Sequence, residues 1–362
     1  MELTPELISL LQIHFNWNLA RCKCIAALIL GLLTLGTVNL AVLCLALPGK
    51  AQKDSKYRRV QRLFSEVEPN LELTAKFIAE KLKMDKYVLA MDRTNWKFGI
   101  FNINILFIAI VYEGMAVPVV WTFLSKKGNS NTSERITVMD RYISIFGESS
   151  IDCLLGDREF IGRDWFAYLS EKNIKIRQRI KYDALIGKRR GGKAPAKNFC
   201  RSLKVGESMS LDGKRDLWGH SVYVTVARLE TEYLIIVSFD MAACSEIMSD
   251  YKKRWKIETM FKALKSQGFN FEDTHLTCPK KLELLMELLA IAFCWACLAG
   301  KYKNDNKEIK LRSHNRKSYT LFRYGLDFLK EILLNLSEML QEGRKMVALL
   351  RDGHDGCRKL IL

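Results

Sequence analysis

The sequence predicts a mixed α/β fold in which a mixed sheet, flanked by helices, lies between two helical regions. Three strand-like runs rich in Val, Ile and aromatic residues fall between residues 86 and 124, separated by turn residues as in a β-meander. Helical and strand-like patterns then alternate from 133 to 180, which indicates strands joined by crossover helices. From 182 to 239, glycine-containing loops and alternating runs such as "SVYVTVARL" indicate a β-rich insertion.

Charge favours a polyanionic partner. The 362 residues include 57 Lys and Arg against 40 Asp and Glu, a formal net charge of +17. Basic side chains gain affinity for nucleic acid by displacing counterions from its phosphates, so DNA or RNA is the leading partner class. Residues 172–204 hold twelve Lys or Arg and one acid, and "GKRRGGKAPAK" within them predicts a flexible basic loop that follows a phosphate backbone. The alternative is an ordinary solvated surface.

The two helical regions complete the organisation. Before residue 80 the segment "SKYRRVQRLF" places three Arg on a helix with apolar residues, which suits an accessory domain that contacts nucleic acid. After residue 276, "KLELLMELLAIAFCWACLAG" is apolar nearly all round and is expected to be buried. The predicted units are a helical N-terminal domain (1–80), the first part of the core (81–181), the β-rich insertion (182–240), the rest of the core (241–275) and a helical C-terminal region (276–362).

Cysteines and histidines offer no metal or nucleophile motif. The ten Cys lack the regular spacing of a secreted disulfide framework, so we expect free thiols in a reducing compartment. Cys294 and Cys297 form a C-x-x-C, but it lies in an apolar helix without a second ligand pair, so core cysteine is the better interpretation. The five His are scattered along the chain.

One segment imitates a membrane span. Residues 24–49 contain 26 uncharged residues between two Lys, which is long enough to cross a bilayer. The central "TLGTVN" indicates a turn followed by a helix cap, so we predict two short packed helices and no membrane partner. No cleavable signal-peptide pattern is expected, because the apolar run starts late.

A basic stretch, "YKKRWKIETMFKALK" at 251–265, holds a single acid, Glu258. On a helix, four of its side chains share one face, at offsets 0, 3, 7 and 14: Tyr251, Arg254, Glu258 and Lys265. A neighbouring apolar stripe would pack on the core and present that polar row outward: Ile257, Met260, Phe261 and Leu264. The alternative is a solvated helix on which Glu258 merely pairs with Arg254 and Lys262.

Two further acids follow buried strands. Asp92 closes the run "YVLAM" and Asp157 closes "IDCLLG", and open α/β sheets place their sites at such strand ends. An Asp after a strand often only caps the next turn. Together with Glu258, however, three acids on packed elements repel one another unless a cation relieves them, and Mg²⁺ takes oxygen ligands. Two such ions can assist phosphoryl transfer.

These residues resemble a known family. The spacing Tyr251-x2-Arg254-x3-Glu258-x6-Lys265 resembles the Tyr-Arg-Glu-Lys signature of bacterial insertion-sequence DDE transposases, in the branch called family four. "MDRTNWKFG" and "GDREFIGRDWF" are similar to the first and second acid motifs of that family, and "SKYRRVQRLF" to the segment before its catalytic domain. The resemblance covers about residues 50–330. It implies an RNase H-like catalytic core with the β-rich insertion between the second Asp and the Glu.

The resemblance also implies residue roles. It implies a catalytic triad of Asp92, Asp157 and Glu258 that binds two Mg²⁺ ions. Mn²⁺ is expected to substitute for Mg²⁺. It also implies that the terminal phosphates of the DNA are contacted by Tyr251, Arg254 and Lys265. Trp255 would hold a displaced base by stacking, against the alternative of an ordinary core Trp. Glu159, near Asp157, is a candidate outer partner of the triad.

The implied activity is cut-and-paste transposition. Such an enzyme frees the terminal inverted repeats of double-stranded DNA and joins them to target DNA, as a homodimer bridging both ends, in the bacterial cytoplasm at the nucleoid. The apolar helix at 284–298 is a candidate for the dimer interface. Two alternatives remain open: an RNase H-like DNA nuclease without strand transfer, and a catalytically silent DNA-binding derivative of a transposase.

Overall fold

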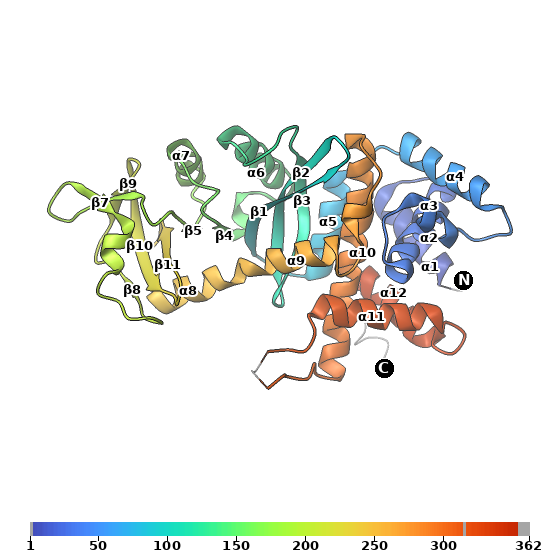
Figure 1. Cartoon of the computed structure of the whole chain (residues 1–362). Coiled ribbons are helices and arrows are strands. Elements are labelled where there is room, and N and C mark those ends of the chain that lie inside the picture. The colour runs from blue at the N-terminus through green and yellow to red at the C-terminus, as the bar shows by residue number, and fades with distance from the viewer. Residues whose placement is uncertain (1–2, 314–315, 354–362) are drawn as a thin grey trace.

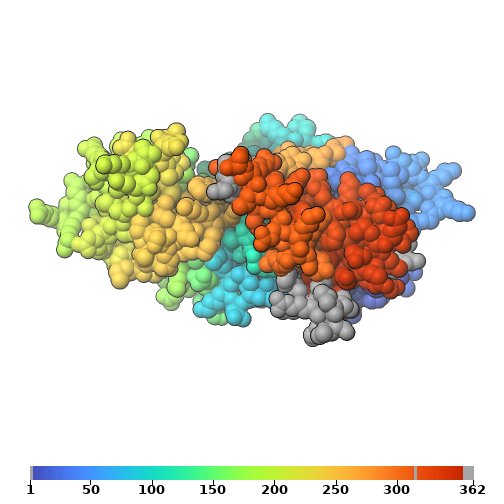
Figure 2. All heavy atoms as spheres, turned by 90° about the horizontal axis from the view of Figure 1, so that it is seen from below, coloured from blue at the N-terminus to red at the C-terminus, as the bar shows by residue number. Residues whose placement is uncertain are grey.

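The structure, a computed structural model, describes residues 3–313 and 316–353. The molecule is elongated, with a strand-rich end, a central sheet and a helical end that contains the N-terminal helices (Figure 1). Seen from below, the C-terminal helices form much of the surface beside the N-terminal ones (Figure 2). The predicted mixed α/β class, a sheet flanked by helices between helical regions, is confirmed.

The first eighty residues fold as helices. They are α1 (Thr4–Phe15), α2 (Leu19–Leu35), α3 (Leu40–Leu43), α4 (Lys53–Glu66) and α5 (Leu71–Leu82). Helix α2 ends at Gly36, whose φ of +64° is the left-handed conformation that glycine adopts easily. The side chain of Asn39 then accepts a hydrogen bond from the backbone N–H of Ala41 and caps α3. The predicted break at "TLGTVN" is therefore confirmed.

Helix α10 (Pro279–Asn306) forms the core of the C-terminal region. It is the one described helix long and apolar enough to cross a membrane by composition, but 94% of its apolar window is buried inside the protein. The pair α1 and α2 passes the same test only together, and the two are bent by 117°. Because the side chains at 284–298 are almost all buried within the chain, the prediction that they form a dimer interface is wrong.

Helix α11 (Leu321–Leu334) crosses α10 at very short range, and α12 (Leu340–Asp352) packs beside both. A Cβ atom on Gly300 would lie 1.9 Å from the carbonyl oxygen of Leu321, and one on Gly325 would lie 1.9 Å from that of Ala296. Only glycine permits backbones to approach so closely. The nine described cysteines are free thiols, as predicted, and Cys294 and Cys297 are buried in α10.

The sheet is continuous and mixed, in the order β3-β2-β1-β4-β5-β11-β10-β8, with β9 paired to β10. Strands β1, β2 and β3 form the predicted antiparallel meander, while β1, β4 and β5 are parallel neighbours. Helices α6 (Thr132–Phe146) and α7 (Arg163–Glu171) provide the crossovers. The strands are β1 (Tyr87–Phe98), β2 (Phe101–Tyr112), β3 (Met115–Phe123), β4 (Ile151–Gly156), β5 (Ile176–Arg179), β8 (Ser208–Ser210), β9 (Arg215–Leu217), β10 (His220–Arg228) and β11 (Tyr233–Ser238).

The segment 182–240 is rich in strands, and it continues the central sheet, because β11 pairs with β5. The division into five units stays a prediction. The segment "GKRRGGKAPAK" is not one open loop: it holds the turn and second strand of a hairpin formed by β6 (Leu185–Gly187) and β7 (Lys193–Pro195). Lys188 N–H donates to the Gly192 carbonyl oxygen at 2.9 Å, which closes the turn and leaves the basic side chains at its tip.

The stretch 251–265 forms parts of two helices, α8 (Cys244–Lys253) and α9 (Trp255–Lys265), that meet at Arg254. Of its predicted apolar stripe, Ile257, Met260 and Leu264 are buried, and Phe261 is partly buried against the same core. The polar row, however, does not all face outward, because Tyr251 and Arg254 are buried. Helix α8 packs on β5 and α9 on β3 and β1, so the junction lies against the sheet (Figure 1).

Candidate active site

The two aspartates lie on neighbouring parallel strands. Asp157 follows β4 directly, as predicted, but Asp92 lies inside β1, which continues to Phe98. The prediction that a strand ends at Asp92 is wrong, because β1 keeps pairing with β2 beyond it. The parallel pairing of β1 with β4 does end just before, at Met91 and Gly156. Asp92 and Asp157 are therefore the first residues beyond the paired part of β1 and β4, at the point where the two chains separate.

A buried arginine joins Asp92 to Glu258. Arg254 Nη1 lies 3.3 Å from Asp92 Oδ2, and its Nη2 donates to Glu258 Oε1 at 2.8 Å. The Arg254 side chain is only 3% exposed, whereas that of Glu258 is 49% exposed. Tyr251, Asp157 and Asp92 all favour the charged guanidinium and, despite burial, raise the pKa of Arg254. Asp92, Asp157 and Glu258 thus lie around one cation.

Burial sets the ionisation of Asp92. Desolvation raises the pKa of Asp92 to about 6, and the nearby Asp157 and Glu159 carboxylates add to the effect. The backbone N–H of Arg93, which donates to Asp92 Oδ1 at 2.7 Å, and the Arg254 guanidinium offset part of it. A carboxyl group with this environment gains most from a second positive charge beside it.

Comparison with known proteins identifies the class of this site. A family model described as a transposase DDE domain matches residues 83–295, more than half of the chain. The chain belongs to this family. No curated protein matches the chain. The match covers Asp92, Asp157 and Glu258, and it confirms the expected DDE transposase, whereas the branch with the Tyr-Arg-Glu-Lys signature stays a prediction.

DDE transposases normally use divalent metal ions, and the donor chemistry fits one. Carboxylate oxygens are the ligands that Mg²⁺ takes, and Asp92 and Asp157 supply them from adjacent strands. In the described part of the chain, no three His, Cys, Asp or Glu residues lie together closely enough to hold an ion. The contacts give the reason: Arg254 lies between Asp92 and Glu258 and bonds both.

The other signature residues have different surroundings. The Tyr251 hydroxyl is buried without a hydrogen-bond partner among the described residues, and its ring centre lies 5.7 Å from Arg254 Cζ. Trp255 is 42% exposed, so its interpretation as a core residue is wrong. Lys265 donates to the carbonyl oxygen of Asn95 at 3.1 Å and pairs with Glu272 at 2.8 Å. It therefore lies at the other end of α9, beside the last residues of β1.

An open basic pocket borders Asp157. It has a volume of about 490 Å³, and four cations line it: Arg158, Arg179, Lys181 and Lys197. Two acids, Asp183 and Glu232, also line it, and Glu232 pairs with Arg179. Arg179 connects the pocket to the acids, since its Nη1 lies 4.0 Å from Asp157 Oδ1. The charge of this segment was predictable from the sequence, but the pocket was not, because it forms only when β11 pairs with β5.

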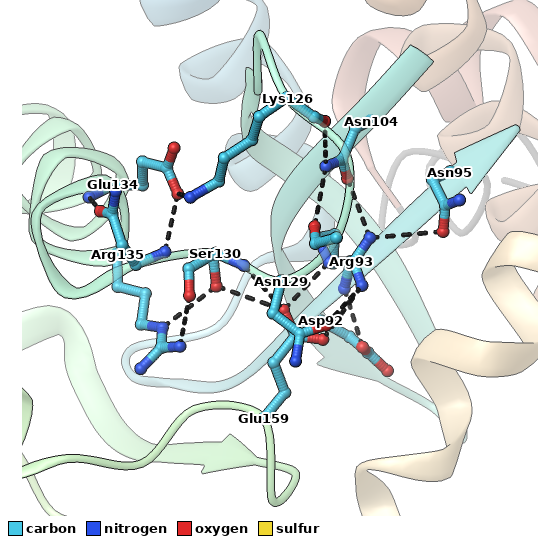
Figure 3. Close-up of polar contacts among 12 residues, drawn as sticks. Asp92, Arg93, Asn95, Asn104, Lys126, Asn129, Ser130, Glu134, Arg135 and Glu159 are labelled. Carbon is cyan, nitrogen blue, oxygen red and sulfur yellow. Dashed lines mark hydrogen bonds and ion pairs between the residues drawn. The ribbon is translucent and has the colours of Figure 1, made fainter. Parts of the chain in front are cut away.

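Sequence reasoning also missed Arg93. Its guanidinium forms a two-point ion pair with Glu159, with Nε 3.0 Å from Oε1 and Nη2 3.3 Å from Oε2 (Figure 3). Glu159 was expected to support the triad, and it contacts Arg93, the neighbour of Asp92 in sequence. The available signal was the Asp-Arg pair that recurs in "MDRT" and "GDRE".

Proposed function

We propose that this transposase excises its own insertion sequence and joins it to target DNA by metal-dependent phosphoryl transfer. The observation that carries the proposal is the convergence of three elements, in a DDE transposase chain, on one buried cation. Asp92 comes from β1, Asp157 from the end of β4, and Glu258 from α9. These are the acids of the predicted triad.

In this proposal Asp92, Asp157 and Glu258 hold two Mg²⁺ ions, for which Mn²⁺ substitutes. Bound there, Mg²⁺ supplies a Lewis acid that favours the attacking oxygen and stabilises the leaving one. The chain's own residues hold the DNA. Trp255, exposed on α9, offers an aromatic face on which a displaced base can stack, and Lys265 offers a cation near the end of β1.

Arg254 has two roles in this account. In the structure it pairs with Asp92, which is mostly buried, and with the half-exposed Glu258, which offsets the repulsion between the two carboxylates. We propose that a terminal phosphate of the bound DNA takes over contacts of Arg254, since guanidinium binds phosphate with two parallel hydrogen bonds. Arg254 weakens metal binding by the two carboxylates while it bonds them, so they would then bind metal more tightly. Tyr251, whose hydroxyl has no described partner, would contact the same phosphate.

The remaining parts of the proposal concern the whole complex. The N-terminal domain (1–80) would contact DNA through α4, whose Arg58, Arg59 and Arg62 are exposed while its apolar side chains are buried. The basic pocket beside Asp157 would hold backbone phosphates of the same DNA. A homodimer bridging the two inverted repeats, in the bacterial cytoplasm at the nucleoid, follows from the resemblance to insertion-sequence transposases.

The products of the reaction test this function. Labelled DNA carrying the ends of the parent element is incubated with Mg²⁺ and wild-type protein, Glu258→Gln, or the control Glu171→Gln, which changes an exposed Glu at the end of α7. We expect wild type and Glu171→Gln to produce excised ends joined to target DNA. We expect Glu258→Gln to produce none. Hydrolysis without joining would point to the nuclease alternative, and binding without cutting to the silent derivative.

A further inference from the structure

The ion pair between Arg93 and Glu159 belongs to a polar network beside Asp92 (Figure 3). All five N–H groups of the Arg93 guanidinium have a hydrogen-bond acceptor. Two donate to Glu159, and the others to the side-chain oxygens of Asn95 (3.3 Å), Asn104 (3.0 Å) and Asn129 (3.1 Å). Arg93 therefore has no donor left for a phosphate, unlike Arg254, whose Nε has no described partner.

The network joins four segments of chain. Asn104, from β2, is buried, and its Nδ2 donates to the carbonyl oxygens of Lys126 (2.9 Å) and Gly128 (3.0 Å) in the loop between β3 and α6. From that loop, the backbone N–H of Ser130 donates to Glu159 Oε1 at 3.1 Å. The loop after β4, which carries Glu159, is thereby fixed to β1, to β2 and to the β3–α6 loop.

This connection bridges the place where backbone pairing stops. The β1–β4 ladder ends at Met91 and Gly156, so no strand hydrogen bond spans the next residues, Asp92 and Asp157. Arg93 is one residue beyond the first of these acids, and Glu159 two beyond the second. Both side chains are mostly buried, 11% and 18% exposed, so solvent screens the pair weakly.

We propose that Arg93 and Glu159 are positioning residues that hold the Asp92 and Asp157 carboxylates at a fixed separation for a divalent cation. The inference rests on the proposed function in taking these two acids as metal ligands. Partners of this kind, which orient ligands without touching the metal, typically change metal affinity by about 10–100-fold when they are removed.

The direction of the Arg93 effect separates positioning from simple electrostatics. Removing the Arg93 cation in Arg93→Met leaves more negative charge near the acids, so Coulomb's law alone predicts tighter cation binding. Positioning predicts the opposite, because the loop that carries Asp157 loses its connection to β1. Arg93→Lys keeps the charge, but it cannot reproduce the two-point contact with Glu159.

The experiment titrates Mn²⁺ into the DNA-free full chain and measures the free ion by electron paramagnetic resonance. We expect Arg93→Met, Arg93→Lys and Glu159→Gln each to bind Mn²⁺ about tenfold or more weakly than wild type. The double variant Arg93→Met with Glu159→Gln should bind no more weakly than the poorer single one, because both remove one connection. Lys126→Met is the control, because it removes a neighbouring pair with Glu134, at 2.8 Å, that does not reach either Asp.

Unchanged or tighter Mn²⁺ binding by Arg93→Met, in protein that melts like wild type, would overturn the proposal. So would wild-type protein that binds no Mn²⁺, or a wild type whose binding survives Asp92→Asn. Arg93→Lys, which keeps the charge but not the two-point contact with Glu159, decides the matter if Arg93→Met does not fold. Wild-type protein that binds Mn²⁺ through Asp92 but cuts no DNA would contradict the proposed function alone, and the positioning pair would still be judged by its affinities.

Discussion

At the scale of single residues, the site depends on how one buried cation is shared. Arg254 bonds Asp92 and Glu258 in the structure, while Asp157 lies close enough to favour the charge of Arg254. A buried charge persists only where it is paired, so Arg254 and the acids stabilise one another before any metal or DNA arrives. The same pairing explains why a stretch with six cations, residues 251–265, keeps one carboxylate.

Arg254→Lys tests this sharing. Lysine keeps the charge, but its single ammonium group cannot bond two carboxylates and then a phosphate in the planar geometry of guanidinium. A hydrogen bond to a charged group contributes about 1.5–3 kcal/mol, so we expect cleavage of the element's ends to slow by about tenfold or more. The measurement is single-turnover cleavage with saturating Mg²⁺, with Lys262→Arg, on the exposed side of α9, as the control. Cleavage at the wild-type rate would show that Arg254 does not act in the reaction.

At the scale of elements, long helices hold the acids against the sheet. Helices α8 and α9 cross the whole width of the sheet, so Glu258 reaches Asp92 only because both helices are packed. Behind them, α10 contacts β3 and α5 on one side and α11 on the other. Two features of α10 give this packing measurable consequences: its glycine contact with α11 and its buried Glu287.

Gly300→Ala should loosen the α10–α11 crossing. The added methyl group would lie 1.9 Å from the Leu321 carbonyl oxygen, so the two backbones must separate. Overpacking of this kind typically costs about 1–3 kcal/mol, and we expect a clearly lower Tm in thermal unfolding. Lys330→Ala, on the exposed face of α11, controls for the substitution itself. An unchanged Tm for Gly300→Ala would mean that the crossing is not tightly packed.

Glu287 makes stability depend on pH. Burial raises the pKa of Glu287 to about 8, with Glu283 adding to the effect, and the Asn70 backbone and Thr74 hydroxyl offset only part of it. In the unfolded chain the pKa is near 4.5, so the folded state binds one more proton between these values. The contribution of this group to the free energy of unfolding is therefore full below about pH 4.5 and falls as pH rises to about 8.

The variant Glu287→Gln should remove that dependence. Glutamine stays neutral at every pH, so its Tm should exceed that of wild type at pH 8.5, while the difference shrinks or reverses at pH 5. Thermal unfolding at the two pH values measures the effect. Glu283→Gln, which changes the neighbouring acid, 29% exposed and with a pKa also raised by burial, serves for comparison. A Tm difference independent of pH would refute a raised pKa at Glu287.

At the scale of the whole molecule, local sequence patterns predicted the class of fold but not its long-range pairing. The β-meander, the helix break at Gly36 and the apolar stripe of α9 depend on neighbours a few residues away, and the structure confirms them. The hairpin at 185–195 is local, but its Gly and Pro residues predicted a loop. The pairing of β11 with β5 joins segments far apart in sequence. Periodicity alone carries no information about such contacts.

The site was predictable to a similar degree. Asp92 and Asp157 could be selected because each follows a strand-like run, and Glu258 because it belongs to one fixed spacing. The family match covers all three positions. The burial of Tyr251 and Arg254 could not be predicted from the sequence. It depends on how α8 packs against β10 and β11, where Tyr251 joins a small apolar cluster. The Arg93 network likewise needs the β3–α6 loop to fold back onto β1.

The central claim is that Asp92, Asp157 and Glu258 act as one metal-binding set. The most direct measurement is the rate of Mg²⁺-dependent cleavage of the element's end by Asp92→Asn, Asp157→Asn and Glu258→Gln, beside Asp152→Asn, an exposed acid on β4. Metal contacts are worth several kcal/mol in such a transition state, so each of the three should lose about 100-fold or more, while Asp152→Asn keeps its activity. Wild-type rates in any of the three would contradict the account.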